Sequence, residues 1–135
     1  MVSRAFVTAL VAAACLTLAP TAAAQPSYPT DDRGFVGSEV RCDAPASVVV
    51  FGRTAESLVA ICLDAHGHYE YRGARIGDNA VLIVVAEPTV PGEFFAQKNG
   101  ATYTVTAKEL IIKSDEFVRD EPMLAFAGPG IPIEG

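Results

Sequence analysis

The spacing of the apolar residues from position 47 onward is what most restricts the fold of this chain. These residues come in short runs or alternate with polar residues, and no stretch keeps the period of an amphipathic helix. The pattern predicts an all-β domain. Its strands are expected at residues 47–51, 57–63, 69–75, 80–86, 93–97, 101–106, 109–113 and 117–119.

Turn-forming residues stand between these expected strands. They are His66-Gly67, Gly77-Asp78-Asn79, Pro91-Gly92 and Asn99-Gly100, and Asn-Gly is the strongest signal because both residues tolerate a positive φ. Connections this short join only antiparallel neighbours. We therefore expect a small antiparallel meander that forms a two-layer sandwich or a barrel.

Two runs, Leu58–Leu63 and Ala80–Ala86, are apolar on both of their alternating faces. Such strands are expected at the centre of a fold, where both faces are covered. The second cover is expected from the lead-in at residues 25–34, from the carboxyl-terminal tail with Leu124 and Phe126, or from a partner chain.

The first 24 residues have the three parts of a Sec signal peptide. Arg4 supplies the positive end, residues 5–18 the apolar run, and Ala22–Ala24 the small residues before a cleavage site. The run is shorter than the roughly 20 residues that span a bilayer, and no later segment is long enough, so no transmembrane segment is expected after cleavage. Lipidation at Cys15 is the alternative, but the residues after it stay apolar.

Cleavage after Ala24 removes Cys15 and leaves Cys42 and Cys62 in an oxidising compartment. We predict a disulfide between them, because the alternatives, a metal pair or free thiols, have no supporting ligands at metal spacing. The expected organisation is a flexible lead-in at residues 25–34, a β domain at 35–127 and a flexible tail at 128–135. The mature charge, nine basic against sixteen acidic residues, is −7 and argues against nucleic acid as a partner.

The two histidines of the chain, His66 and His68, are a candidate metal pair, with Asp64 or Glu70 as the third ligand. The competing interpretation is a polar hairpin loop around Gly67. No nucleophile elbow surrounds a serine such as Ser57, and no phosphate, zinc or calcium motif is present, so neither catalysis nor a cofactor is predicted.

The stretch from Tyr69 to Gly73 is the most distinctive of the chain. Tyr69 and Tyr71 share one strand face and Arg72 the other. The tyrosines are expected either in the core, with their hydroxyls at its edge, or as an exposed aromatic pair that binds a partner together with Arg72.

Several motifs resemble those of small exported proteins from mycobacteria, nocardiae and related actinobacteria. The resemblance covers most of residues 40–126 and is carried by Gly52-Arg53-Thr54, Cys62, Tyr69–Gly73, Thr102-Tyr103-Thr104-Val105 and Glu121-Pro122-Met123. It implies export and an actinobacterial envelope setting, and it implies no catalytic or ligand residues.

The leading hypothesis is a secreted or envelope-associated, non-catalytic β domain that binds a protein or an envelope component. A second hypothesis is a carrier of a small apolar ligand, with an enclosed barrel pocket lined by Phe94, Phe95, Tyr103 and Phe117. A third is a metal-binding or enzymatic role centred on His66 and His68.

Overall fold

The computed structural model describes residues 28–128, which form eleven β-strands and no helix. No helix there is long and apolar enough to cross a membrane. The strands are β1 (Thr30–Asp31), β2 (Gly34–Phe35), β3 (Ser47–Arg53), β4 (Ser57–Leu63), β5 (Tyr69–Arg75), β6 (Val81–Pro88), β7 (Phe94–Lys98), β8 (Ala101–Val105), β9 (Glu109–Lys113), β10 (Val118–Pro122) and β11 (Ala125–Ala127). The expected signal peptide, with Cys15, and residues 129–135 of the expected tail lie outside the described residues.

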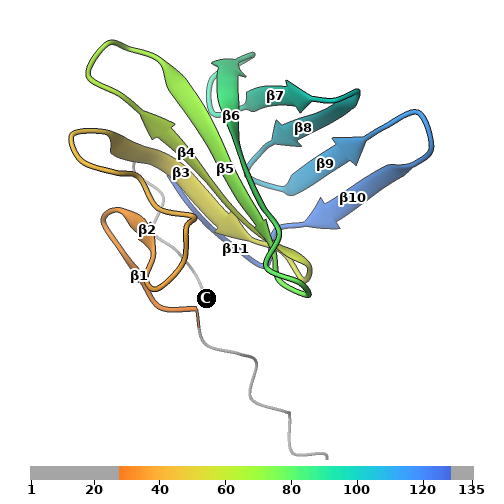
Figure 1. Cartoon of the computed structure of the whole chain (residues 1–135), viewed down its shortest axis with the longest axis horizontal. Coiled ribbons are helices and arrows are strands. Elements are labelled where there is room, and N and C mark those ends of the chain that lie inside the picture. Colours follow the sequence, from red (N-terminus) through yellow and green to blue (C-terminus); the bar gives the residue numbers. More distant parts are fainter. Residues whose placement is uncertain (1–27, 129–135) are drawn as a thin grey trace, which may run out of the picture.

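Nine of the strands form one antiparallel sheet in the order β10-β9-β8-β7-β6-β5-β4-β3-β11. From β3 to β10 each strand pairs with the next one along the chain, so the predicted all-β meander is confirmed. The sheet curls into a half-barrel (Figure 1).

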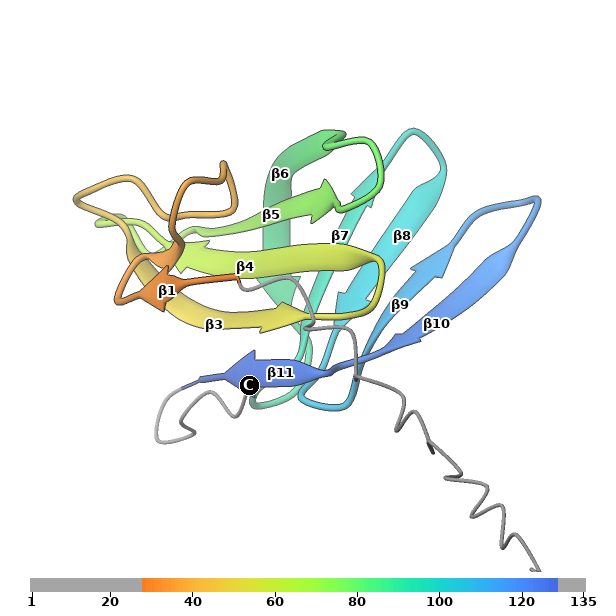
Figure 2. The same ribbon diagram turned by 90° about the horizontal axis from the view of Figure 1, so that it is seen from below.

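The two ends of the sheet are joined by a link of two residues, Met123 and Leu124. β10 pairs with β9 at one end of the sheet, and β11 pairs with β3 at the other end (Figure 2). The Met123 amide donates to the carbonyl of Lys108 at 2.9 Å, and the Leu124 amide to the carbonyl of Arg53 at 2.7 Å. These two hydrogen bonds hold the β8–β9 turn and the end of β3 close to each other at this link.

Away from the link the sheet divides into two arms. β6 pairs with β5 from Val81 to Ala86, but it pairs with β7 only from Ala86 to Pro88. β3–β6 form one arm and β7–β10 the other, and the two diverge from the shared end of β6 (Figure 1). Among residues 28–128, the stretch Val81–Val85 has no strand partner on the β7 side; we call it the free edge of β6.

The main core fills the inner, concave face of the sheet. It contains Val50, Val59, Ile61, Tyr71, Ala86, Phe94, Ala96, Val105, Leu110 and Ile112. These residues come from both arms, because alternate residues of each strand point to the same face of the sheet. The aromatic rings meet in pairs: Tyr69 lies 5.2 Å from Phe94 between ring centroids, and Tyr71 lies 5.3 Å from Tyr103.

A second core covers the outer face of β4. Leu58 and Ala60 pack there with Phe35 and Val40. One of the two doubly apolar strands thus receives its second cover from residues just after the expected lead-in. The outer face of β6 does not: among the described residues nothing buries Val81, Ile83 and Val85, which are 41 %, 42 % and 75 % exposed.

Part of the expected flexible lead-in is structured. Thr30–Asp31 and Gly34–Phe35 form a two-stranded antiparallel ladder, and Gly34 also bridges to Arg41. The segment has no apolar period that would reveal a strand. Hydrogen bonds, the Asp31–Arg41 ion pair and the burial of Phe35 order it instead.

Candidate functional site

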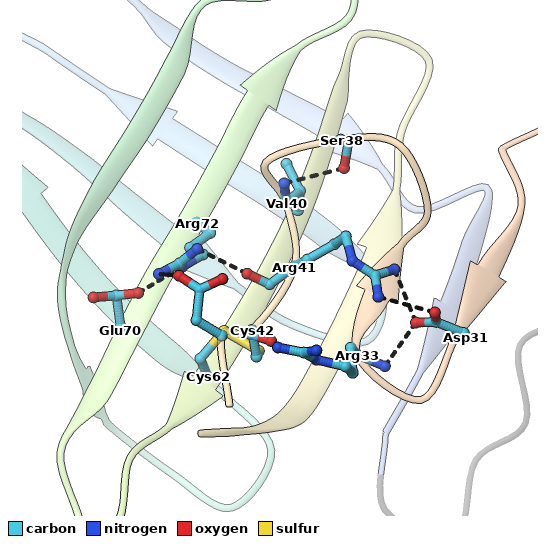
Figure 3. The surroundings of a disulfide bond; sticks show 10 residues. Asp31, Arg33, Ser38, Val40, Arg41, Cys42, Cys62, Glu70 and Arg72 are labelled. Atoms are coloured by element: carbon cyan, nitrogen blue, oxygen red, sulfur yellow. Dashed lines mark hydrogen bonds and ion pairs between the residues drawn. A yellow bond between two sulfur atoms is a disulfide. The ribbon is translucent and has the colours of Figure 1, made fainter. Parts of the chain in front are cut away.

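The guanidinium of Arg72 joins β5 to the segment that precedes β3. Its Nη1 donates to the carbonyl of Arg41 at 2.9 Å, its Nη2 to Asp43 Oδ2 at 3.2 Å, and its Nε to Glu70 Oε1 at 2.6 Å (Figure 3). Partial burial acts to lower the pKa of Arg72, but the hydrogen bond to Glu70 and the nearby carboxylates outweigh it and raise that pKa above its ordinary value. Arg72 is therefore a fixed cation in the outer surface.

The predicted disulfide is confirmed and lies beside Arg72. Cys42 and Cys62 are bonded, with their Cα atoms 5.5 Å apart (Figure 3). Cys62 stands on the outer face of β4, since it pairs with Glu70 of β5. The disulfide thus anchors residue 42 to the outer face of the sheet.

The segment before Cys42 is held by its own charges. Both terminal nitrogens of Arg41 donate to the Asp31 carboxylate at 2.9 Å, which is a bidentate pair. These bonds, with the backbone amide of Arg33, hold the pKa of Asp31 below its usual range. Arg33 Nε donates to the carbonyl of Cys42 at 3.0 Å, so the segment reaches the disulfide in one defined conformation.

A groove of about 840 Å³ follows from this arrangement; we call it the outer groove. Residues 43–46 form one side and residues 85–88 of β6 the other, with Glu70, Arg72 and Cys62 between them. Its charged and titratable lining residues are Asp43, Asp64, His68, Glu70, Arg72 and Glu87. Four carboxylates thus face one arginine and one histidine, so the outer groove is negatively charged.

The expected metal pair lies on the β4–β5 hairpin loop, at the rim of the outer groove. Asp64 Oδ1 accepts the backbone amides of His68 at 2.9 Å and His66 at 2.8 Å, which lowers the pKa of Asp64. The two imidazoles lie 6.3 Å apart between centroids, and His68 Nδ1 lies 3.5 Å from Asp64 Oδ2. In residues 28–128 no group of three histidine, cysteine, aspartate or glutamate side chains is placed to hold a metal ion.

The structure separates the three expected binding residues. Tyr71 is 3 % exposed and lies in the core on the inner face, whereas Arg72 lies on the outer face. Tyr69 packs partly buried against the core and also lines the outer groove. The tyrosines therefore follow the core interpretation, and Tyr69 and Arg72, but not Tyr71, contribute to the outer groove.

The four residues expected to line an enclosed carrier pocket do not share one cavity. Phe94 is buried in the main core, and Phe95, its neighbour in β7, points to the opposite face. Tyr103 and Phe117 do meet, in a separate cavity of about 280 Å³ between the two arms. Ser57 also lines this cavity, although its sequence context gives no sign of it.

No protein-family profile, curated protein or solved structure matches this chain.

Proposed function

We propose that this chain is a non-catalytic binding module of the extracytoplasmic space, and that β6 docks an extended segment of another protein. One observation carries the proposal: three exposed β-branched residues, Val81, Ile83 and Val85, stand in a row on the free edge of β6. The Cys42–Cys62 disulfide is compatible with an extracytoplasmic location.

An apolar strand with an unpaired edge is a template for pairing with another chain. Proteins normally protect such an edge with charged side chains or proline. Residues 81–86 contain neither. An extended peptide that adds to this edge would gain main-chain hydrogen bonds, and its alternate side chains would cover the exposed row.

The outer groove indicates the charge of that segment. Val85 belongs both to the free edge of β6 and to the outer groove, and Glu87 of the same strand also lines the groove. Three further carboxylates, those of Asp43, Asp64 and Glu70, line the groove. Arg72 is already engaged by Asp43 and Glu70. The partner segment therefore combines aliphatic side chains, which cover β6, with lysine or arginine side chains, which enter the groove.

Site-specific photo-crosslinking in the native host tests the proposal. A photoreactive phenylalanine analogue at Ile83 is expected to give one discrete heteromeric adduct in the culture filtrate or envelope fraction. The matched control is Val118, an exposed valine at 66 % on the outer face of the edge strand β10. The proposal fails if both positions give the same adducts, if Ile83 gives none, or if it links only two copies of this chain.

Charge reversal in the groove gives a second test with the partner that the crosslink captures. Glu87→Lys changes an exposed carboxylate that makes no hydrogen bond within residues 28–128. We expect slower association and a weaker dependence of affinity on salt. Asp120→Lys, an exposed carboxylate on β10, is the control and is expected to leave both unchanged.

A further inference from the structure

The cavity of about 280 Å³ between the two arms, which we call the inner cavity, opens onto the free edge of β6. Its walls come from β4, β5 and β6 on one arm and from β8, β9 and β10 on the other. Val81 and Leu82, the first residues of the free edge, both line it. The inner cavity therefore lies in the opening that forms where β6 leaves β7 (Figure 1). A segment that pairs with the free edge would run along its mouth.

The alternation of side chains along β6 determines which part of a docked segment meets the inner cavity. Val81, Ile83 and Val85 are exposed on the outer face. Leu82 and Val84 pack against the main core on the inner face. In a strand that adds to this edge, successive side chains also point to opposite faces of the sheet. One set therefore covers the exposed row, and the side chain across from Leu82 points into the inner cavity.

The charged residues at the mouth of the inner cavity are ion-paired. Arg75 Nη1 lies 3.0 Å from Asp78 Oδ2. Arg119 Nε lies 2.9 Å from Glu121 Oε2 and 3.4 Å from Glu56 Oε2. Two arginines thus meet three carboxylates, so the mouth carries no excess of positive charge. Burial of an unpaired charge is unfavourable, and the cavity therefore favours an uncharged occupant.

Three aromatic rings contribute to the mainly apolar walls of the inner cavity. Tyr71 and Tyr103 lie 5.3 Å apart between ring centroids. Phe117 is 47 % exposed, and the guanidinium of Arg119 lies 5.8 Å from its ring centroid. Aromatic rings pack favourably on one another at centroid distances of about 4.5–7 Å. The volume lies just below the range of about 300–1,000 Å³ for drug-sized ligands, so the cavity suits one aromatic side chain.

On the basis of the proposed docking at β6, we infer that the inner cavity receives one aromatic side chain of the docked segment. The segment holds this residue across from Leu82, between the two aliphatic residues that cover Val81 and Ile83. The ring covers the exposed face of Phe117 on the other arm. The basic side chains of the segment follow toward the outer groove, which begins at Val85.

Photo-crosslinking from inside the cavity tests this inference, with the crosslink from Ile83 as its reference. A photoreactive phenylalanine analogue at Phe117 keeps a ring in place and puts the reactive group in the inner cavity. In the native host we expect it to capture the same partner segment as the analogue at Ile83. Val118 is the matched control, because it follows Phe117 in the chain but lies on the outer face of β10, and it is expected to give no such adduct.

The sequence of the captured segment, read by mass spectrometry, is the second readout. We expect a phenylalanine, tyrosine or tryptophan with an aliphatic residue on each side. If Ile83 captures a partner and Phe117 does not, or if the segment has no aromatic residue, docking on β6 stands and the cavity assignment is wrong. If Ile83 captures no partner, the docking proposal fails and the cavity assignment fails with it.

Filling the inner cavity gives an independent test. Ala101 lines it on β8, so Ala101→Leu adds apolar volume there and leaves β6 unchanged. We expect the yield of the Ile83 adduct to fall about tenfold, because the aromatic side chain loses its apolar site. Thr102→Leu adds a similar side chain on the outer face of β8 and is expected to keep the yield. Melting temperatures check that both variants fold, and the Phe117 crosslink needs neither of them. A folded Ala101→Leu protein with the parental yield would contradict the assignment.

Discussion

One hydroxyl and one carboxylate fasten the β3–β4 turn to β10. Thr54 is fully buried and Glu121 is 4 % exposed. The Thr54 hydroxyl donates to Glu121 Oε1 at 2.6 Å and accepts the amide of Ser57 at 2.9 Å. Glu121 Oε2 accepts from Arg119 Nε at 2.9 Å. The buried carboxylate is thus supplied with a donor on each oxygen, as its burial requires.

Replacing Thr54 by valine keeps the shape of the side chain and removes both functions of its hydroxyl. We expect the free energy of unfolding to fall by about 1.5–3 kcal/mol, because a charged, buried acceptor loses its donor. Urea denaturation measures this. Thr102→Val, on the outer face of β8, is the control and is expected to change stability by less than about 0.5 kcal/mol. A Thr54→Val protein as stable as the control would contradict this role.

The aromatic ring of Tyr71 lies against the backbone of Gly73 and occupies the space that a side chain there would need. In Gly73→Ala the added Cβ would lie 2.6 Å from Tyr71 Oη and 2.7 Å from Cε1, so the ring must move within a packed core. We expect a loss of about 1–3 kcal/mol in the free energy of unfolding. Gly77→Ala meets no atom within 4 Å and is the matched control. Equal stability of the two variants would show that the ring relocates freely.

The motifs Gly52-Arg53-Thr54 and Glu121-Pro122-Met123 contain residues that meet where the two ends of the sheet are joined. Thr54 bonds to Glu121, and a Cβ on Gly52 would lie 2.8 Å from Met123 Sδ. These contacts were not predictable from local patterns, because their partners are 67 or more positions apart along the chain. Ser57 was missed as a cavity residue for a similar reason, because Phe117 and Arg119, which line the same cavity, lie far along the chain from it.

At the scale of elements, alternation and turn residues predicted the strands of the meander well. The expected strand at residues 117–119 was too short: β10 runs from Val118 to Pro122, and Glu121 points inward against the usual rule for charged residues. The very short strands β1, β2 and β11 were missed, since two or three residues carry no measurable period.

Apolar residues on both faces predicted that β4 and β6 would each be covered on both sides. In the structure only β4 is. The outer face of β4 is buried by Phe35 and Val40, whereas the outer face of β6 stays exposed among the described residues. The two runs look alike in the sequence. Which one receives a cover depends on where the disulfide anchors the preceding segment, and that is a tertiary property.

Loss of the disulfide is expected to release the segment that covers β4. For the double variant Cys42→Ser/Cys62→Ser we expect the free energy of unfolding to fall by about 2–5 kcal/mol, as in other small secreted domains. Amide hydrogen exchange of residues 34–42 should rise more than that of β7–β9. Uniformly unchanged exchange would mean that Phe35, Val40 and the ion pairs hold the segment without the covalent link.

For the whole molecule, the buried phenol of Tyr71 predicts a limit of stability at alkaline pH. Burial, with smaller contributions from Tyr103 and Glu121, raises the pKa of Tyr71 above the ordinary value of 10.0. A raised pKa in the folded state means that the stabilising contribution is complete below about 10, and is lost as the pH rises beyond it because only the unfolded chain ionises there.

Absorbance titration of the tyrosines, together with circular dichroism, measures this limit. Tyr71 should ionise only as the β-sheet signal is lost. Tyr71→Phe should unfold at a higher pH than the parent. If the parent and Tyr71→Phe lose the β-sheet signal at the same pH, ionisation of Tyr71 does not limit stability and the prediction is wrong.

The link Met123–Leu124 also sets the order in which the molecule can fold. Each hairpin from β3 to β10 closes a short loop and can form as soon as its second strand exists, whereas β11 must return to β3 across most of the domain. During synthesis from the amino terminus, β3 therefore has no partner on its outer edge until residues 125–127 have been made. We expect contacts of β11 to be absent from the folding transition state, with φ-values near zero at Ala125 and Ala127.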